Sequence, residues 1–184
     1  MQTFHKVANV FGATSAIFRV PTTRGDVFMR IDRTPSQNDK RAVVEVEMSR
    51  FLAAWRREPH SIHEAEANGS PETWSMDRKF HWAEDGFAAG EQNPVPVARV
   101  GCAEYSLVRP IYKRRFWLFN RRAGAERESG SYACFTNGVT RTIWLATFGA
   151  KVFPVECGVT DAPQLAQVAG STGRFYTVDE LTQR

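Results

Sequence analysis

The sequence has no long hydrophobic run and few cysteines. It contains no stretch of about 18 apolar residues, so we expect no membrane insertion. The first residues carry one early lysine and a broken apolar pattern, so we expect no cleaved secretory signal. Cys102, Cys134 and Cys157 are widely spaced and odd in number, which argues against a disulfide framework. The cysteines also lack zinc-ligand spacing and fit a reducing cytosol.

Internal repeats, low-complexity tracts and a helix-turn-helix pattern are also absent from the sequence. The 184 residues, 42% hydrophobic and 24% charged, are typical of one soluble globular domain with an appended arm. Residues 34–41 form a polar linker, so we expect an N-terminal extension over 1–41 and the main domain over 42–184. Within the extension, residues 17–20 and 26–31 predict the two strands of a hairpin.

The main domain alternates short strand and helix patterns, which predicts an α/β (α+β) fold with a mixed sheet. Apolar and acidic residues alternate over 43–48, which predicts a half-buried strand, and Ser49 is a candidate N-cap for a helix over 48–57. The other expected elements are a loop over 58–76, a helix over 77–89, an extended segment over 92–102, strands within 105–119, a loop over 120–130, a strand over 131–136, a helix over 140–148, a strand over 152–156, a helix over 162–169 and a capped turn of helix over 177–181.

The turn at Asn137-Gly138 joins an expected strand directly to an expected helix. A helix that starts at a glycine turn presents free backbone N–H groups and the positive end of its dipole. Phosphate is a common ligand of such a site, and Arg141 can add a charge-assisted contact. Thr140 and Thr142 add hydroxyl groups. The alternative is an ordinary crossover helix whose arginine faces water.

The order of residues around this turn resembles the ParB/sulfiredoxin-like superfamily. The matching positions are Phe135, Gly138, Arg141, Gly149 and Pro154-Val155. More narrowly, DRKFHWAEDGFAAGEQNPVPVARV and FTNGVTRTIWLATFGAKVFPVEC resemble the plasmid fertility inhibition factors, including their oncogenic suppression branch. The resemblance covers residues 42–180 and implies a ParB/sulfiredoxin-like fold for that region.

The resemblance also implies a function, which is interference with conjugative or T-DNA transfer through ATP hydrolysis and DNA cleavage. Val139 and Thr140 stand where sulfiredoxins have Cys and His, so thiol chemistry is excluded. They also replace the acidic residue and the arginine of chromosome-partitioning relatives, which argues against a CTP switch. Phosphate binding by residues 137–142 remains, with ATP and Mg²⁺ as the expected cofactors. The residues assigned to this role are Asn137, Gly138, Val139, Thr140, Arg141 and Thr142.

Hydrolysis further needs groups that neutralise charge and orient water. The catalytic candidates are Arg141, Glu84, Asp85 and Glu156, the metal candidates are Glu84 and Glu91, and further pocket candidates are Arg78, Lys79, His81 and Asn93. Each of these carboxylates also fits a solvated surface position, and His81 fits a packing role. His60 and His63 lie in the expected loop without an obvious partner.

Basic residues concentrate between Arg109 and Arg122, where no acidic residue occurs. Aromatic residues are interleaved with them, and this combination suits binding of phosphates and stacking on bases. The DNA-binding candidates are Lys113, Arg114, Arg115, Arg121 and Arg122. The alternative is an amphipathic strand with aromatic residues in the core and basic residues in solvent.

The expected partner is therefore DNA, as the transferred strand or T-DNA. A second hypothesis is a non-catalytic inhibitor that binds the coupling protein of a type IV secretion system. A third is a DNA-binding repressor, but the sequence contains no helix-turn-helix pattern to support it. The expected location is cytoplasmic, or peripheral to the inner membrane through a secretion-system partner.

Overall fold

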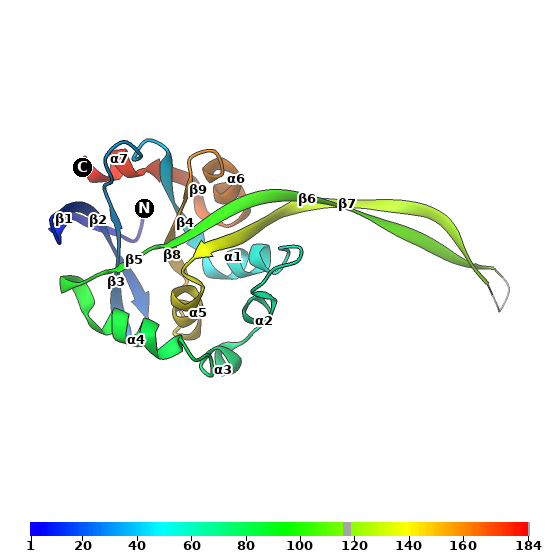
Figure 1. Ribbon diagram of the computed structural model, residues 1–184, viewed down its shortest axis with the longest axis horizontal. Coiled ribbons are helices and arrows are strands. Elements are labelled where there is room, and N and C mark those ends of the chain that lie inside the picture. Colours follow the sequence, from blue (N-terminus) through cyan, green and yellow to red (C-terminus); the bar gives the residue numbers. More distant parts are fainter. Residues whose placement is uncertain (116–118, 184) are drawn as a thin grey trace.

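Two mixed sheets and short helices form the body of the molecule, and a two-stranded ribbon projects far from it (Figure 1). This computed structural model describes residues 1–115 and 119–183, and the side chains of Arg109 and of residues 112–123 lie outside the description. The architecture is mixed α+β, which confirms the predicted fold class.

The first sheet contains the hairpin predicted within residues 1–41. Its strand order is β1-β2-β3-β5, with β1 over Phe4–Val10, β2 over Ala13–Thr22, β3 over Gly25–Asp32 and β5 over Val95–Pro96. β2 and β3 are antiparallel, and β5 joins β3 in parallel. Ala16, Phe18 and Met29 are fully buried and belong to the hydrophobic core shared with the rest of the body. The N-terminal strands thus contribute to one core.

The second sheet has the order β7-β6-β8-β4-β9. Its strands are β4 over Arg41–Glu47, β6 over Ala98–Arg115, β7 over Phe119–Asn137, β8 over Val152–Gly158 and β9 over Gly170–Thr177. β4 lies between β8 and β9 and is buried along its length, so the prediction of a half-buried strand is wrong. Glu45 is buried because its carboxylate accepts hydrogen bonds from the backbone N of Gln2 (2.9 Å) and of Thr3 (2.5 Å).

Short helices cover these sheets and connect their strands. They are α1 over Met48–Trp55, α2 over Glu64–Ala67, α3 over Pro71–Trp74, α4 over Phe80–Ala88, the 3-10 helix η1 over Gly90–Gln92, α5 over Val139–Thr147, α6 over Ala162–Val168 and α7 over Val178–Thr182. The predicted loop over 58–76 therefore contains two one-turn helices. Ser49 does not cap α1, since it lies inside the first turn and donates to Glu47 Oε1 at 2.6 Å. The capping box of Thr177 and Glu180 at α7 is confirmed.

An aromatic cluster fixes the body end of β7 against α1. Phe51 and Trp55 of α1 pack edge-on against Phe135 of β7, with ring centroids 5.5 and 4.7 Å apart, and Phe51 also packs edge-on against Phe153 of β8. Each edge-to-face pair of this kind stabilises the fold by about 0.5–1.5 kcal/mol beyond the contribution of the apolar area it buries. The start of α5 at Val139, four residues after Phe135, is therefore held in a fixed place.

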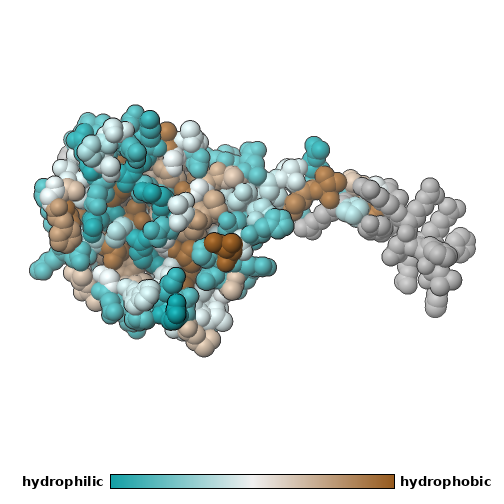
Figure 2. All heavy atoms as spheres, in the orientation of Figure 1, coloured by the Kyte–Doolittle hydropathy of each residue, from teal (hydrophilic) through white to brown (hydrophobic). Residues whose placement is uncertain are grey.

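The ribbon consists of β6 and β7, which pair from Arg99↔Asn137 outward to Arg115↔Phe119. The predicted loop over 120–130 is wrong, since these residues form part of β7. The segment is charged and contains two glycines, which is typical of a loop. A strand that projects from the body packs on no core, so its sequence need not alternate apolar and polar residues. Leu107, Val108 and Ile111 are 42, 56 and 42% exposed, and Figure 2 shows apolar atoms partway along the ribbon.

In the part of the chain that the structure describes, no helix has the length and apolar character needed to cross a membrane.

Candidate phosphate-binding cleft

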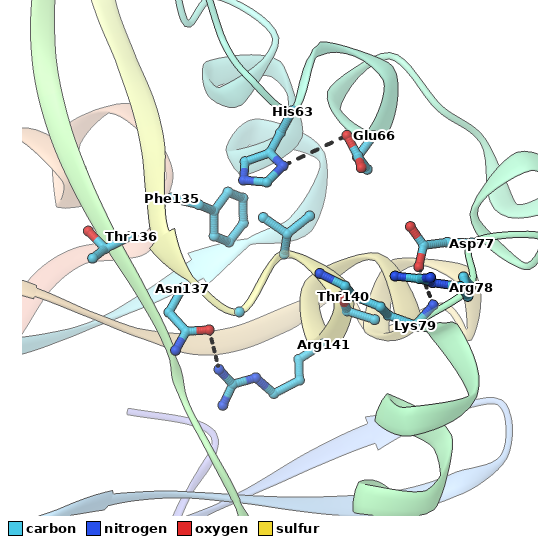
Figure 3. Close-up of a pocket in the computed structure, with 12 residues that line it drawn as sticks. His63, Glu66, Asp77, Arg78, Lys79, Phe135, Thr136, Asn137, Thr140 and Arg141 are labelled. Carbon is cyan, nitrogen blue, oxygen red and sulfur yellow. Dashed lines mark hydrogen bonds and ion pairs between the residues drawn. The ribbon is translucent and has the colours of Figure 1, made fainter.

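A cleft of about 480 Å³ opens at the start of α5. Its walls come from three chain segments, which are His63 with Glu66, residues 77–79, and residues 135–141 (Figure 3). The turn singled out in the sequence is thus exposed to solvent rather than covered by neighbouring side chains.

Gly138 makes the sharp turn from β7 into α5. Its φ is 98°, in the left-handed region that favours glycine. A Cβ at this position would lie 2.7 Å from the Cα of Ala98 on β6. The turn therefore requires glycine for two separate reasons, backbone conformation and the close approach of β6.

The first turn of α5 leaves backbone donors available to the cleft. The amide of Thr142 donates to the Gly138 carbonyl at 3.0 Å, and α5 has no side-chain cap. The amides of Val139, Thr140 and Arg141 precede this bond and therefore have no partner within the helix. Together with the positive end of the helix dipole they form a site suited to an anion.

Thr142 does not reach this site, although the sequence assigned it to phosphate binding. It is fully buried, and its hydroxyl donates to the Gly138 carbonyl at 3.1 Å. The helical period turns it towards the core, since Ile143, Trp144 and Leu145 beside it are buried as well. The other five residues assigned to phosphate binding line the cleft.

Arg141 lines the cleft and also ties α5 to both sheets. Its guanidinium donates to Asn137 Oδ1 at 3.3 Å and to the carbonyl of Pro96 on β5. Burial lowers the pKa of the Arg141 guanidinium from its ordinary value. These contacts hold the side chain in one place beside the free amides, which is the preorganisation that anion binding needs.

Arg78 and Lys79, in the turn before α4, bring two more cations to the cleft. The Lys79 amide donates to Asp77 Oδ1 at 2.6 Å, which shapes this turn. Both residues were sequence candidates for the pocket. His81 and Asn93, named with them, are not among the lining residues.

The carboxylates predicted to take part in hydrolysis lie elsewhere. Glu84 is paired with Arg24 on the N-terminal hairpin, and Asp85 is exposed on α4. The carboxylate of Glu156 is 9% exposed, with Arg41 Nε 2.7 Å and Arg99 Nη2 3.3 Å from its Oε1. None of the three lines the cleft.

The residues predicted to hold Mg²⁺ do not fit that ion. Glu84 is engaged by Arg24, and Glu91 pairs with Lys6, whose hydrogen bond lowers the pKa of the Glu91 carboxyl. Among the described residues, no three His, Cys, Asp or Glu side chains gather in a way that could hold a metal. Both carboxylates are therefore occupied by cations of the chain itself.

His63, Glu66 and Asp77 are cleft residues that the sequence did not indicate. His63 Nδ1 lies 3.9 Å from Glu66 Oε2, three residues further along the chain. A spacing of three residues places two side chains on one face only in a helix, so it would have pointed to this pair only if a helical turn had been predicted at 64–67. That turn is four residues long and too short to show periodicity.

The DNA-binding candidates lie away from this cleft. The backbones of Lys113, Arg114 and Arg115 on β6, and of Arg121 and Arg122 on β7, belong to the outer part of the ribbon, far from α5 (Figure 1). Their side chains are outside the described part of the structure.

Comparison with known proteins gives two matches. Residues 43–170 match the family model described as Plasmid Fertility inhibition factor. The fold is similar to the crystal structure of the Oncogenic Suppression Activity Protein, a plasmid fertility inhibition factor, in its gold(I) cyanide derivative. The TM-score is 0.67 at 23% identity, and the match covers 98% of this chain and 82% of that chain. At this identity, the likeness shows the fold alone. No curated protein matches the chain.

Proposed function

Because the chain belongs to the plasmid fertility inhibition factor family, we propose that it blocks conjugative or T-DNA transfer by a rival system through ATP-dependent DNA binding and nuclease activity. The observation that carries this proposal is the meeting of three cations, in one solvent-exposed cleft, with helix amides that precede the first intrahelical hydrogen bond and have no side-chain cap. The cations are Arg78, Lys79 and Arg141.

The cleft supplies what phosphoryl transfer needs most, which is positioning and electrostatic stabilisation. A phosphate group in the cleft accepts hydrogen bonds from the amides of residues 139–141. Arg141 offers its remaining N–H donors, and Arg78 and Lys79 neutralise charge from the opposite wall. ATP and the DNA backbone share this phosphate chemistry, so one site can recognise either.

The basic residues of the outer ribbon are assigned to DNA binding in this proposal. The argument is their charge in the sequence, since six basic residues and no acidic one occur from 109 to 122. Cations on a projecting ribbon can neutralise several phosphates along a strand. We therefore expect DNA binding to weaken steeply as salt concentration rises.

Loss of a cleft cation tests the proposal. In purified protein supplied with ATP, MgCl₂ and plasmid DNA, we expect Arg78→Ala and Arg141→Ala to lower ATP turnover and DNA cleavage at least 100-fold, the order of magnitude for one transition-state donor. Arg78→Ala is the cleaner variant because Arg141 also holds Pro96 and Asn137.

The matched control is Arg174→Ala. Arg174 is exposed on β9, at the edge of the second sheet opposite β7. Circular dichroism and the urea unfolding midpoint verify that each variant is folded. Wild-type turnover in folded Arg78→Ala and Arg141→Ala protein would refute a phosphate role for the cleft.

The ribbon favours a second candidate function, non-catalytic inhibition by binding the coupling protein of the secretion system. Its exposed apolar residues Leu107, Val108 and Ile111 suit contact with another protein. If this candidate is right, Arg141→Ala leaves inhibition of plasmid transfer intact in a mating assay. Ser substitutions at the three apolar positions then abolish inhibition while ATP turnover is unchanged.

A further inference from the structure

His63 and Glu66 face the start of α5 from the opposite wall of the cleft. Figure 3 shows the His63 imidazole lying between Phe135 and Glu66, above the first turn of α5. The two side chains are 32 and 30% exposed, so water has access to both. Nδ1 of His63 is the ring nitrogen directed at Glu66, with 3.9 Å between Nδ1 and Oε2.

The other ring nitrogen is available for chemistry. Within the described residues, no hydrogen bond is formed by His63 Nε2, whereas the His63 backbone amide donates to Ser61 Oγ at 3.2 Å. The remaining charged groups that line the same cleft are Asp77, Arg78, Lys79 and Arg141. Of these, Asp77 already accepts a hydrogen bond from the Lys79 amide, and the three cations have no lone pair to accept a proton.

We propose that His63 is the general base of the hydrolysis and that Glu66 positions it, an inference that rests on the proposed function. The negative charge of Glu66 lies 3.9 Å from Nδ1, beyond hydrogen-bond distance, and favours the tautomer with the proton on Nδ1, which leaves the lone pair on Nε2. Nε2 takes a proton from a water molecule as the water oxygen bonds to phosphorus. The bond from phosphorus to the leaving oxygen breaks, and that oxygen departs with the electron pair. Nε2 then releases the proton to solvent.

The test compares two histidines of the same segment. His63→Asn and the control His60→Asn are measured for hydrolysis of ATP across pH 5.5 to 9, and for binding of a non-hydrolysable ATP analogue by calorimetry. His60 is exposed, lies outside the cleft and has a φ of 60°, a conformation that Asn tolerates. Glu66→Gln is measured in the same way.

We expect His63→Asn to lower kcat about 100-fold or more at pH 8, the usual contribution of a general base, and to leave analogue affinity within about twofold. The wild-type rate falls on the acid side as imidazole is protonated, and this acid limb disappears in His63→Asn. Glu66→Gln gives a smaller loss of kcat and moves the acid limb, which a merely structural residue does not do. His60→Asn behaves as wild type.

Three outcomes overturn the inference. If His63→Asn keeps the wild-type kcat and acid limb, His63 is not the base, and the proposed function stands. If the acid limb disappears in Asp77→Asn instead, Asp77 is the base. If the wild-type protein neither binds the analogue nor hydrolyses ATP, the proposed function fails together with the inference.

Discussion

Gly138 is the residue on which the shape of the cleft depends most. Its left-handed φ turns the chain from β7 into α5, and its missing side chain lets β6 approach. The sequence alone indicated the turn, because Asn-Gly before an apolar helix pattern is a strong local signal. The contact with Ala98 could not be predicted, since Ala98 lies 40 residues earlier in the chain.

We expect Gly138→Ala to lower the free energy of unfolding by more than backbone strain alone would. The control is Gly173→Ala, because Gly173 has a φ of 70° and no atom within 4 Å of the position that an added methyl group would take. We expect Gly173→Ala to lower the free energy of unfolding by about 1–2 kcal/mol. Gly138→Ala should lower it further, since the added methyl group meets the backbone of β6. Urea unfolding measures both, and equal losses would contradict the account.

The three cysteines give a prediction for alkaline pH. Burial raises the pKa of Cys102 to about 11 and that of Cys157 to about 12, while the ordinary value is 9.0. The unfolded chain therefore loses these protons first, so the free energy of unfolding falls as pH rises above about 9. Below pH 8 both states keep the protons, and this contribution to stability is fully present.

Urea unfolding of reduced protein at pH 8 and pH 10 checks this sign. We expect wild-type protein to lose more stability between the two pH values than Cys157→Ala, in which one buried thiol is gone. The difference reports the Cys157 thiol together with its Coulombic coupling to Cys102. The same loss in both proteins would show that Cys157 does not titrate in this way.

At the scale of elements, segments with a clear apolar pattern were predictable and the others were not. The hairpin of β2 and β3, the strand β8 and the helices α5 and α6 follow their apolar patterns. The described residues of the ribbon beyond Ser106 on β6, and residues 124–129 on β7, are exposed, so no hydrophobic period distinguishes these strands from a loop. The burial of Glu45 depends on the N-terminal segment that hydrogen-bonds to it, which no local pattern reveals.

The ribbon is expected to be dispensable for the stability of the body. β6 pairs with β8 only at Ala98 and Arg99 in the described pairing, and the β6 residues beyond Ser106 whose side chains are described are exposed. Replacing residues 109–126 by Asn-Gly joins Val108 to Arg127, which are register partners, through a two-residue hairpin turn.

We expect the free energy of unfolding of this shortened protein to lie within about 1 kcal/mol of the wild-type value, which corresponds to about 2–4 °C in Tm. Val100→Ala provides the comparison, because Val100 is 3% exposed at the body end of the same strand. We expect Val100→Ala to lower the free energy of unfolding by about 1–3 kcal/mol. A shortened protein less stable than Val100→Ala would mean that the ribbon supports the body.

At the scale of the whole molecule, the fold brings three separate segments to one cleft. Residues 137–141 and the cations at 78 and 79 were expected there from the sequence, whereas His63 and Glu66 were not. The predicted carboxylates failed to reach the cleft because each has a cation or solvent as its partner: Arg24 for Glu84, Arg41 and Arg99 for Glu156, and water for Asp85. Sequence spacing identifies chemical types, but only packing decides which of them meet.

The central claim is that the amides of residues 139–141 bind phosphate oxygens, and backbone amide chemical shifts test it most directly. In ¹H–¹⁵N spectra of the ¹⁵N-labelled protein titrated with ATP, we expect the largest shift changes at Val139, Thr140 and Arg141. Gly173 on β9 should stay unchanged, and Arg78→Ala should weaken the response. Unchanged amide signals at 139–141 at saturating ATP, or changes confined to another part of the body, would contradict the claim.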